Sequence, residues 1–314
     1  MSKSKNPVVS ICMITYGHEA FIKQAIESVL MQHTNFDFEL IIADDCSPDN
    51  TKRVVEEIQN SNNKGDCIVY YRHLKNKGVM ANFAFALNKC QGKYIALLEG
   101  DDYWVDELKL QKQFDFLEHN TDYVLSCHNA SVLDENGLVI NDSLLEANRQ
   151  LDFTGEELMI GRHIVTLSMC FRNVIKEFPE SFLKCINGDT LLVSMLGEYG
   201  GSKFQSELKN GVYRIHAGGV WSAMQESKRI KEKNKTFYYQ FKYFKSKGNK
   251  KVKNTLFKKY FSASKSLMKL LWDSNAYLQA IKLYLKIYFN CIRNGYIRKS
   301  FQITKFFFTT TLKI

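Results

Sequence analysis

Carboxylate side chains gather directly after apolar runs that have the length of a strand. The densest group follows the run YIALL and consists of Glu99, Asp101 and Asp102. Three carboxylates within four residues repel one another unless a cation lies among them, and hard oxygen ligands suit Mg²⁺ or Mn²⁺. Such a group could hold a metal that bridges a diphosphate and stabilises it as a leaving group. A solvated turn that caps the next helix is the alternative interpretation.

A second acidic pair, Asp44 and Asp45, follows the apolar run 38–43. This pair could equally cap the next helix, but two acidic strand ends within one sheet favour a ligand. Neither a P-loop nor a G-x-G-x-x-G motif follows the first apolar run, 8–15. We therefore expect a phosphate ligand to be held by a metal more than by a glycine-rich loop.

The first 120 residues alternate between patterns typical of strands and of helices. We expect strands at 8–15, 38–43, 67–71 and 94–98, and helices at 19–31, from about 50 to 59, and at 80–90. This alternation predicts a parallel, doubly wound sheet. Ligands of such sheets bind beyond the carboxyl ends of the strands, so the acidic groups should meet the segment 15–17 in one polar crevice.

The pattern changes after residue 122 and predicts a mixed α+β region. We expect strands at 123–133, 138–140, 166–171 and 212–215, a short helix that opens with a capping box at 154–157, and a helix at 189–199. The Asn-Gly pair at 136–137 indicates a hairpin. Antiparallel strands from this region are expected to extend the first sheet.

The net charge of +10 is divided unevenly along the chain. Residues 225–314 hold 22 Lys and Arg and three acidic residues, whereas the preceding residues hold 21 basic and 30 acidic ones. In this basic tail, lysines are interleaved with Phe and Tyr, and 277–292 forms an apolar helix candidate. The asymmetry indicates a polyanionic partner, either a membrane surface or nucleic acid. A helical appendage that folds back on the body or dimerises is the alternative.

Composition and cysteine usage narrow the class of protein. The hydrophobic fraction of 45% excludes global disorder, and no run of 18 apolar residues indicates a spanning helix. The eight cysteines lack zinc-type spacing, and several lie in apolar runs, which favours reduced thiols. No signal peptide is expected, so we predict a cytosolic protein that is soluble or peripheral.

Five ordered blocks of the sequence resemble one known family. The blocks VSICMITYGHEAFIKQAIESVLMQ, FELIIADDCSPDNT and NKGVMANFAFALNKCQGKYIALLEGDDYW are followed by NGDT at 187–190 and YRIHAGGVWS at 213–222. Together they resemble the family 2 glycosyltransferases with the GT-A fold over about residues 8–222. The resemblance implies an α/β fold, a GT-A-type doubly wound mixed sheet flanked by helices, with a basic helical C-terminal appendage.

The resemblance also implies domain boundaries and a nucleotide pocket. A GT-A domain would span 1–224, with a nucleotide-binding half to about 120 and an acceptor half over 121–224, followed by the tail 225–314. Thr15 and Tyr16 resemble residues that line the nucleobase pocket, and Asp44 or Asp45 would contact the uracil or the ribose. A ring that stacks on a base and a carboxylate that accepts hydrogen bonds suit this role.

Glu99, Gly100 and Asp101 occupy the place of the D-x-D motif of the family, which binds Mn²⁺ or Mg²⁺ and the diphosphate. Because Glu stands at the first position, Asp101 and Asp102 are the preferred metal ligands. His216 resembles a family residue that approaches the diphosphate or the metal, and an ordinary loop histidine is its alternative. The other histidines show no ligand spacing and receive no metal role: His18, His33, His73, His119, His128 and His163.

Asp189 resembles the catalytic base of inverting members, which takes the proton of the acceptor hydroxyl. An ordinary helix N-cap is the alternative for this residue. The resemblance implies a metal-dependent inverting glycosyltransferase that moves a sugar from a nucleotide-sugar donor, most simply a UDP-sugar, to a hydroxyl of a surface glycan or lipid-linked saccharide. It would be cytoplasmic and peripheral at the inner face of the cell membrane, on an anionic surface.

Two hypotheses from other classes stay open at this point. A nucleic-acid-binding protein would use the basic tail, although it would leave the acidic crevice without a purpose; no nucleic-acid partner is expected. A nucleotidyltransferase would share the nucleotide and the metal, but it would usually carry a glycine-rich and basic phosphate loop near the first strand. An oligomer is possible under each hypothesis.

Overall fold

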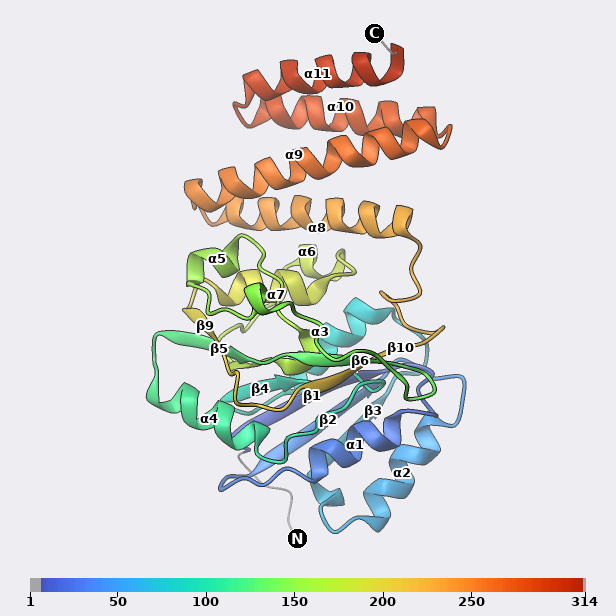
Figure 1. The fold of residues 1–314 in the computed structure, drawn as a ribbon, viewed down its shortest axis with the longest axis vertical. Coiled ribbons are helices and arrows are strands. Elements are labelled where there is room, and N and C mark those ends of the chain that lie inside the picture. Colours follow the sequence, from blue (N-terminus) through green and yellow to red (C-terminus); the bar gives the residue numbers. More distant parts are fainter. Residues whose placement is uncertain (1–6, 313–314) are drawn as a thin grey trace. The chain divides into compact units, whose positions relative to one another are not determined.

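The computed structural model describes residues 7–312, and the chain divides between Ala223 and Met224 into two compact units (Figure 1). The first unit is built around a mixed sheet with helices packed on it, and the second consists of helices. Each unit is described by itself.

The central sheet of the first unit has seven strands in the order β3-β2-β1-β4-β8-β5-β9. Its parallel half consists of β1 (Val9–Thr15), β2 (Phe38–Asp44), β3 (Ile68–Arg72) and β4 (Tyr94–Leu97). The strand β1 is buried along its length and lies between β2 and β4. The register places Thr15 opposite Asp44, so the ends of these strands lie at the same edge of the sheet.

Helices connect the parallel strands, as the alternation predicts. They are α1 (Ile22–Leu30), α2 (Thr51–Ser61) and α3 (Val79–Lys89), and α4 (Lys109–His119) leads from β4 to the other half of the sheet. In α1 the fully buried Ile22, Ile26 and Val29 recur at intervals of four and three residues, which gives the helix one apolar face for the core. The predicted doubly wound, mixed α/β fold is confirmed.

The other half of the sheet is shorter and mixed. The strand β8 (Cys170–Arg172) lies antiparallel to both β4 and β5 (Tyr123–Cys127), and β9 (Gly201–Phe204) is parallel to β5. The predicted strand 166–171 is wrong in its first part, because Thr166–Ser168 forms a 3₁₀ turn and pairing begins at Cys170. The predicted antiparallel extension therefore holds for β8, whereas the edge strand β9 pairs in parallel.

A second sheet of three strands has the order β10-β6-β7. It consists of β6 (Ala130–Asp134), β7 (Val139–Asn141) and β10 (Gly211–Ile215). The predicted single strand 123–133 is wrong, because it breaks at residues 128–129 and its two parts pair in different sheets. At the break, the side-chain oxygen of Asn129 accepts hydrogen bonds from the backbone N–H groups of residues 130 and 145, which turns the chain.

The predicted hairpin is confirmed, because β6 and β7 are antiparallel and Gly137 adopts the positive φ of 85° that the turn requires. The predicted capping box is also confirmed at Thr154 and Glu157. The remaining helices of the first unit are α5 (Gly155–Met159), α6 (Glu180–Leu183) and α7 (Gly188–Leu196), and the other 3₁₀ turns are Gly65–Cys67 and Ala147–Arg149.

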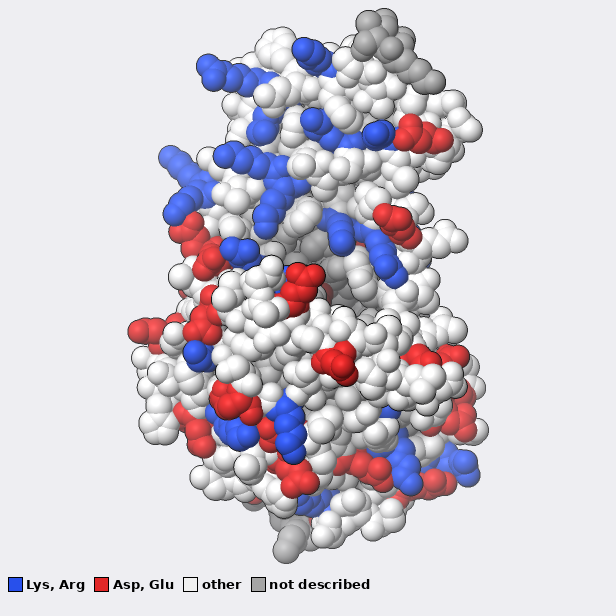
Figure 2. Space-filling view, in the orientation of Figure 1, with Lys and Arg blue, Asp and Glu red and all other residues white. Residues whose placement is uncertain are grey.

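The second unit contains the four helices α8 (Glu226–Ser246), α9 (Lys250–Asp273), α10 (Tyr277–Arg293) and α11 (Ile297–Leu312). Aromatic side chains fill its core, where the rings of Phe241 and Phe257 lie 5.1 Å apart. Among the charged side chains that Figure 2 shows over these helices, most are basic. Within the described residues, no helix combines the length and the apolar character that crossing a bilayer demands.

Candidate active site

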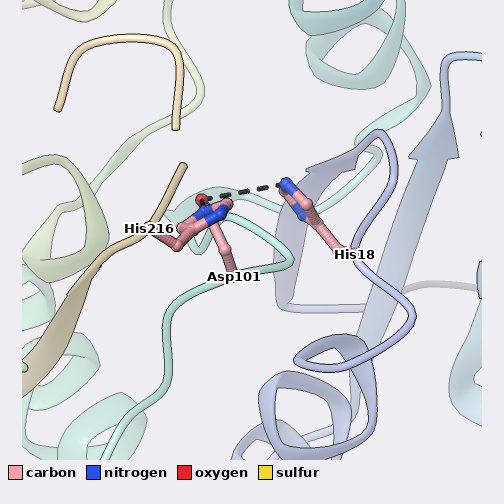
Figure 3. Close-up of side chains that lie close together, drawn as sticks. All are labelled: His18, Asp101 and His216. Carbon is pink, nitrogen blue, oxygen red and sulfur yellow. Dashed lines mark hydrogen bonds and ion pairs between the residues drawn. The ribbon is translucent and has the colours of Figure 1, made fainter. Parts of the chain in front are cut away.

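Three side chains from distant parts of the first unit meet beyond the ends of β1, β4 and β10. The Nε2 atom of His216 lies 3.0 Å from Oδ2 of Asp101, and Nε2 of His18 lies 3.8 Å from the same oxygen. Figure 3 shows both imidazoles turned toward this carboxylate, each from the segment that follows its strand. One ligand atom of each residue lies within 4.8 Å of the other two, so the group could hold a metal ion.

The backbone after β1 and β2 fixes the position of His18. Gly17 adopts a φ of 71°, its N–H donates to Oγ of Ser47 at 3.0 Å, and the N–H of His18 donates to Oγ1 of Thr51 at 3.0 Å. These contacts tie the loop after β1 to the loop after β2. The positive φ of Gly17 turns the chain, so that the next residue lies beside the end of β4.

Gly100 allows this close approach. A Cβ atom at this position would lie 2.8 Å from Oγ1 of Thr15 and 3.0 Å from Nδ1 of His18. The backbone N–H of Gly100 donates to the carbonyl of Ile14 at 3.0 Å, which holds the two segments together. Glycine is therefore the residue that lets the loops after β1 and β4 pack against each other.

The electrostatics of Asp101 differ from those of its neighbours. Burial by itself would raise the pKa of the Asp101 carboxyl, but His18 and the hydrogen bond with His216 hold it below its ordinary value. Burial lowers the pKa of His18, against the opposing effect of Asp101. A low carboxyl pKa and a low imidazole pKa both favour the forms that bind metal, namely the carboxylate and the neutral imidazole.

Glu99 lies next to two other acidic groups. Burial, together with the charges of Asp101 and Asp189, raises the pKa of Glu99 to about 8. A buried cation beside these groups would offset their mutual repulsion. The free-energy cost of this repulsion supports a cationic ligand beside the acidic turn after β4, where the sequence predicts one.

Asp102, which the sequence analysis preferred as a ligand, is not part of this group of possible ligands. Its Oδ1 accepts a hydrogen bond from the backbone N–H of Arg214 at 2.9 Å, and its side chain is buried. The guanidinium of Arg214 donates to the backbone carbonyl of Asp101 at 2.7 Å. Asp102 thus holds β10, the strand that precedes His216, and the group of possible ligands contains His18 instead.

Asp189 lies in the first turn of α7, and Asn187 is the N-cap of that helix. The N-cap interpretation of Asp189 is therefore wrong. Its Oδ2 accepts a hydrogen bond from Oγ1 of Thr166 at 3.1 Å. The charge of Asp189 contributes to raising the pKa of Glu99, so the two carboxyl groups lie near enough to interact.

The acidic pair after β2 is engaged with its own surroundings. Oδ1 of Asp44 accepts from the N–H and the hydroxyl of Ser47 at 2.7 Å each, and Oδ2 accepts from the hydroxyl of Tyr70 at 2.6 Å. Asp45 accepts from the backbone N–H groups of Lys77 and Gly78 at 2.7 and 2.8 Å. Both carboxylates thus shape the loops around the strand end.

Thr15 and Tyr16 differ in exposure. Thr15 is buried, and its hydroxyl finds no hydrogen-bond partner within residues 7–312. Tyr16 is 48% exposed, which leaves its ring free to stack on a planar ligand. The buried Nδ1 of His18 likewise has no partner within the described chain.

Two residues of this site were missed by sequence reasoning. His18 was given no metal role because it shows no ligand spacing with another histidine, and Arg214 was not singled out. The signal for His18 was its place three residues beyond the strand end at Thr15. Histidine and carboxylate ligands can come from separate strand ends, so spacing along the chain is a poor guide here.

The donor set fits a divalent metal ion. Two imidazoles and one carboxylate are typical ligands of first-row transition metals and also accommodate Mn²⁺. Near Gly100, the buried hydroxyl of Thr15 and Nδ1 of His18 have no hydrogen-bond partner among the described residues, so both could contact a bound group.

The fold of this chain is that of known GT-A glycosyltransferases. S. aureus TarS in complex with UDP-GlcNAc has a TM-score of 0.55 and 15% identity to this chain, covering 96% of it and 90% of TarS. The mannosyltransferase PcManGT from Pyrobaculum calidifontis, in complex with GDP-Man and Mn²⁺, has a TM-score of 0.56 and 14% identity, covering 99% and 88%. At these identities the likeness concerns the fold alone.

Sequence comparison identifies the family. The model of Glycosyl transferase family 2 matches residues 10–177, which is more than half of the chain. The chain belongs to this family. An uncharacterized protein of Mycobacterium tuberculosis (strain ATCC 25618 / H37Rv) is 30% identical over 230 residues, which is 70% of this chain and 62% of that protein. The chain thus matches less than two thirds of the length of this relative.

Proposed function

We propose that this chain transfers a sugar from a nucleotide-sugar, most simply a UDP-sugar, to a hydroxyl group of a glycan or lipid-linked saccharide. Membership in the family supports the reaction, and the UDP-GlcNAc complex of TarS supports the choice of nucleotide. The observation that carries the proposal is the meeting of His18, Asp101 and His216 at the strand ends, beside Glu99, whose pKa responds to the charges of Asp101 and Asp189.

The nucleotide would bind in the half of the domain up to about residue 120. The exposed ring of Tyr16 would stack on the base, and the hydroxyl of Thr15 would gain the partner that it lacks among the described residues. The carboxylates of Asp44 and Asp45 would act by shaping the loops around the base and ribose, because backbone N–H groups and hydroxyls already occupy them.

His18, Asp101 and His216 would hold Mn²⁺ or Mg²⁺, and the two imidazoles favour Mn²⁺. When bound, the ion would supply positive charge for the diphosphate that departs from the sugar. Asp102 and Arg214 would keep His216 in place through the bonds that join β10 to the turn after β4.

Asp189 would act as the general base. Its carboxylate would take the proton from the acceptor hydroxyl while the oxygen of that hydroxyl forms the bond to the anomeric carbon and the bond to the diphosphate breaks. A single displacement of this kind inverts the anomeric configuration. The hydrogen bond from Thr166 would orient the carboxylate toward the acceptor, which would enter from the half at 121–224.

Calorimetric titration of UDP and GDP, with and without MnCl₂, tests the donor site directly. We expect UDP binding that depends on Mn²⁺ in the wild type and is lost in Asp101→Asn. Asp152→Asn is the matched control, because Asp152 pairs with Lys203 at the surface. No nucleotide binding with any metal would refute the proposal.

Product analysis then separates the reaction classes. A glycosyltransferase releases UDP from a UDP-sugar, whereas a nucleotidyltransferase forms or consumes a pyrophosphate bond and releases pyrophosphate. Proton NMR of the product would give the anomeric configuration, and retention would refute the role of Asp189 as base in a single displacement.

The acceptor and the location form the remaining part of the proposal. We place the enzyme in the cytoplasm at the inner face of the cell membrane, where a lipid-linked saccharide would present its hydroxyl. The excess of basic residues in the second unit supports this location, because the cytoplasmic leaflet carries anionic lipids.

A further inference from the structure

The helix α10 carries two separate apolar faces. The side chains of Ala280, Ile287 and Cys291 are fully buried and face the other helices of the second unit. A second set lies exposed at intervals of three or four residues and consists of Leu278, Ile281, Leu285, Phe289 and Ile292. Intervals of three and four place these five side chains on one stripe of the helix, away from the buried one.

The helix α11 repeats this arrangement. Ile303 is fully buried, whereas Ile297, Phe301 and Phe308 are exposed at intervals of four and seven residues, with 71% of Phe301 accessible. These three residues also share one side of their helix. We call the exposed apolar residues of α10 and α11 the apolar stripes. All the large apolar side chains that are exposed in the described part of the second unit belong to α10 and α11.

Basic side chains border the apolar stripes. Four basic residues lie next to a stripe residue in the sequence or within one turn of it. They are Lys282 and Arg293 on α10, and Arg298 and Lys305 on α11. All four are exposed, and among the described residues none of them forms an ion pair. An apolar stripe with a cationic border is typical of helices that lie in the interface of an anionic bilayer.

Charge decides between the possible occupants of this surface. A second copy placed on it would bring cationic borders together, because the tail holds 22 basic and only three acidic residues. Lipid phosphates carry the opposite charge, and the acyl chains would cover the apolar stripes. A bilayer surface thus satisfies both the charge and the apolar side chains.

We propose that the apolar stripes of α10 and α11, with Lys282, Arg293, Arg298 and Lys305, form the surface by which the protein binds an anionic lipid bilayer. The helices lie in the interface without crossing it. This inference names the membrane-contacting surface of the proposed enzyme. It rests on the proposed function only for the reason why the protein would bind a membrane. Binding to vesicles requires neither nucleotide nor sugar, so either proposal can fail while the other holds.

Co-sedimentation of the full chain with vesicles tests the surface. We expect binding to vesicles that contain about one third phosphatidylglycerol in phosphatidylcholine at about 0.1 M salt, and little binding to phosphatidylcholine alone. Phe289→Ser/Phe301→Ser should weaken binding at least tenfold. Replacing Lys282, Arg298 and Lys305 by Gln should weaken it about fivefold for each residue, since a basic residue near the surface contributes about that factor.

The matched control is Leu138→Ser/Val139→Ser, which removes two exposed apolar side chains from the hairpin of the first unit. It should bind vesicles like the wild type, and circular dichroism should show that all variants are folded. UDP titration of the same variants should be unchanged.

Several results would overturn the inference. Vesicle binding that all variants retain would mean that another surface is responsible. Absence of binding by the wild type would also refute it, and light scattering would then identify the occupant. A dimer that Phe289→Ser/Phe301→Ser dissociates would mean that a second copy covers the stripes. A monomer that these substitutions destabilise would mean that the first unit covers them.

Discussion

Lys109 is a buried lysine at the start of α4. Its Nζ donates to Oε1 of Gln113 at 2.7 Å and lies 4.0 Å from the centre of the Trp104 ring. Burial lowers its pKa to about 7, against the opposing influence of Cys170, Asp106 and Cys127. The substitution Lys109→Met keeps the length of the side chain and removes its ionisable group, so it tests whether this lysine loses its charge on folding.

The sign and size of the effect follow from proton linkage. Between pH 7 and 8.5 the unfolded chain keeps its proton at residue 109, whereas the folded chain with a pKa of about 7 releases it. The unfolded state binds more protons, so the free energy of unfolding rises with pH by up to about 1.4 kcal/mol per unit. Over this range Lys109 should contribute a rise of about 1.5 kcal/mol, which Lys109→Met should lack.

Urea unfolding at pH 6, 7, 7.75 and 8.5 measures this difference between the wild type and the variant. The comparison stops at pH 8.5, near the pKa of free thiols, and the same cysteines are present in both proteins, so their ionisation largely cancels in the difference. Lys112→Met is the control, since Lys112 pairs with Asp106 nearer the surface. If the wild type and Lys109→Met differ by the same free energy at every pH, Lys109 keeps its charge in the fold and the reasoning fails.

Three further predictions concern the site. Gly100→Ala should weaken Mn²⁺ binding at least tenfold and lower the free energy of unfolding by about 1–3 kcal/mol, because the added Cβ would meet Thr15 and His18. Calorimetry measures the metal affinity and urea unfolding the stability. An unchanged metal affinity would contradict the packing described above. Asp45→Asn should cost about 1–2 kcal/mol of stability, since an amide oxygen cannot replace both carboxylate oxygens that accept from Lys77 and Gly78; an unaltered urea midpoint would contradict it. If the hydroxyl of Thr166 orients Asp189, Thr166→Val should lower kcat about tenfold and leave UDP affinity unchanged. A change in UDP affinity with unchanged kcat would contradict a role of Thr166 in orienting the base.

Much of the fold could be predicted because the central strands β1 and β4 are largely apolar runs that are buried almost throughout. The same reasoning failed at residues 128–129. There the apolar pattern continues into β6, but the side-chain oxygen of Asn129 accepts from the backbone N–H groups of residues 130 and 145 and turns the chain. A side chain that competes with the backbone in this way leaves no trace in the hydrophobic pattern.

The site could be predicted only in part, for a related reason. Asp101 and His216 were identifiable from motifs at strand ends, and the structure brings them within 3.0 Å of each other. The direction of Asp102 depends on the pairing of Tyr103 with Val212, which lies more than 100 residues further along the chain. The approach of His18 depends on the φ of Gly17. Neither contact can be deduced from local sequence.

The distance along the chain between Asp101 and His216 has a consequence for how the molecule forms and opens. These residues are 115 positions apart, and β10, which precedes His216, pairs with β6 in a sheet separate from the central one. Closing such long loops is slow, so a nascent chain can assemble its central strands well before Asp101 and His216 meet. Detachment of β10 would remove His216 and Arg214 together. A bound ion would oppose that detachment by mass action, and amide protons of β10 would then exchange more slowly as the ion concentration rises.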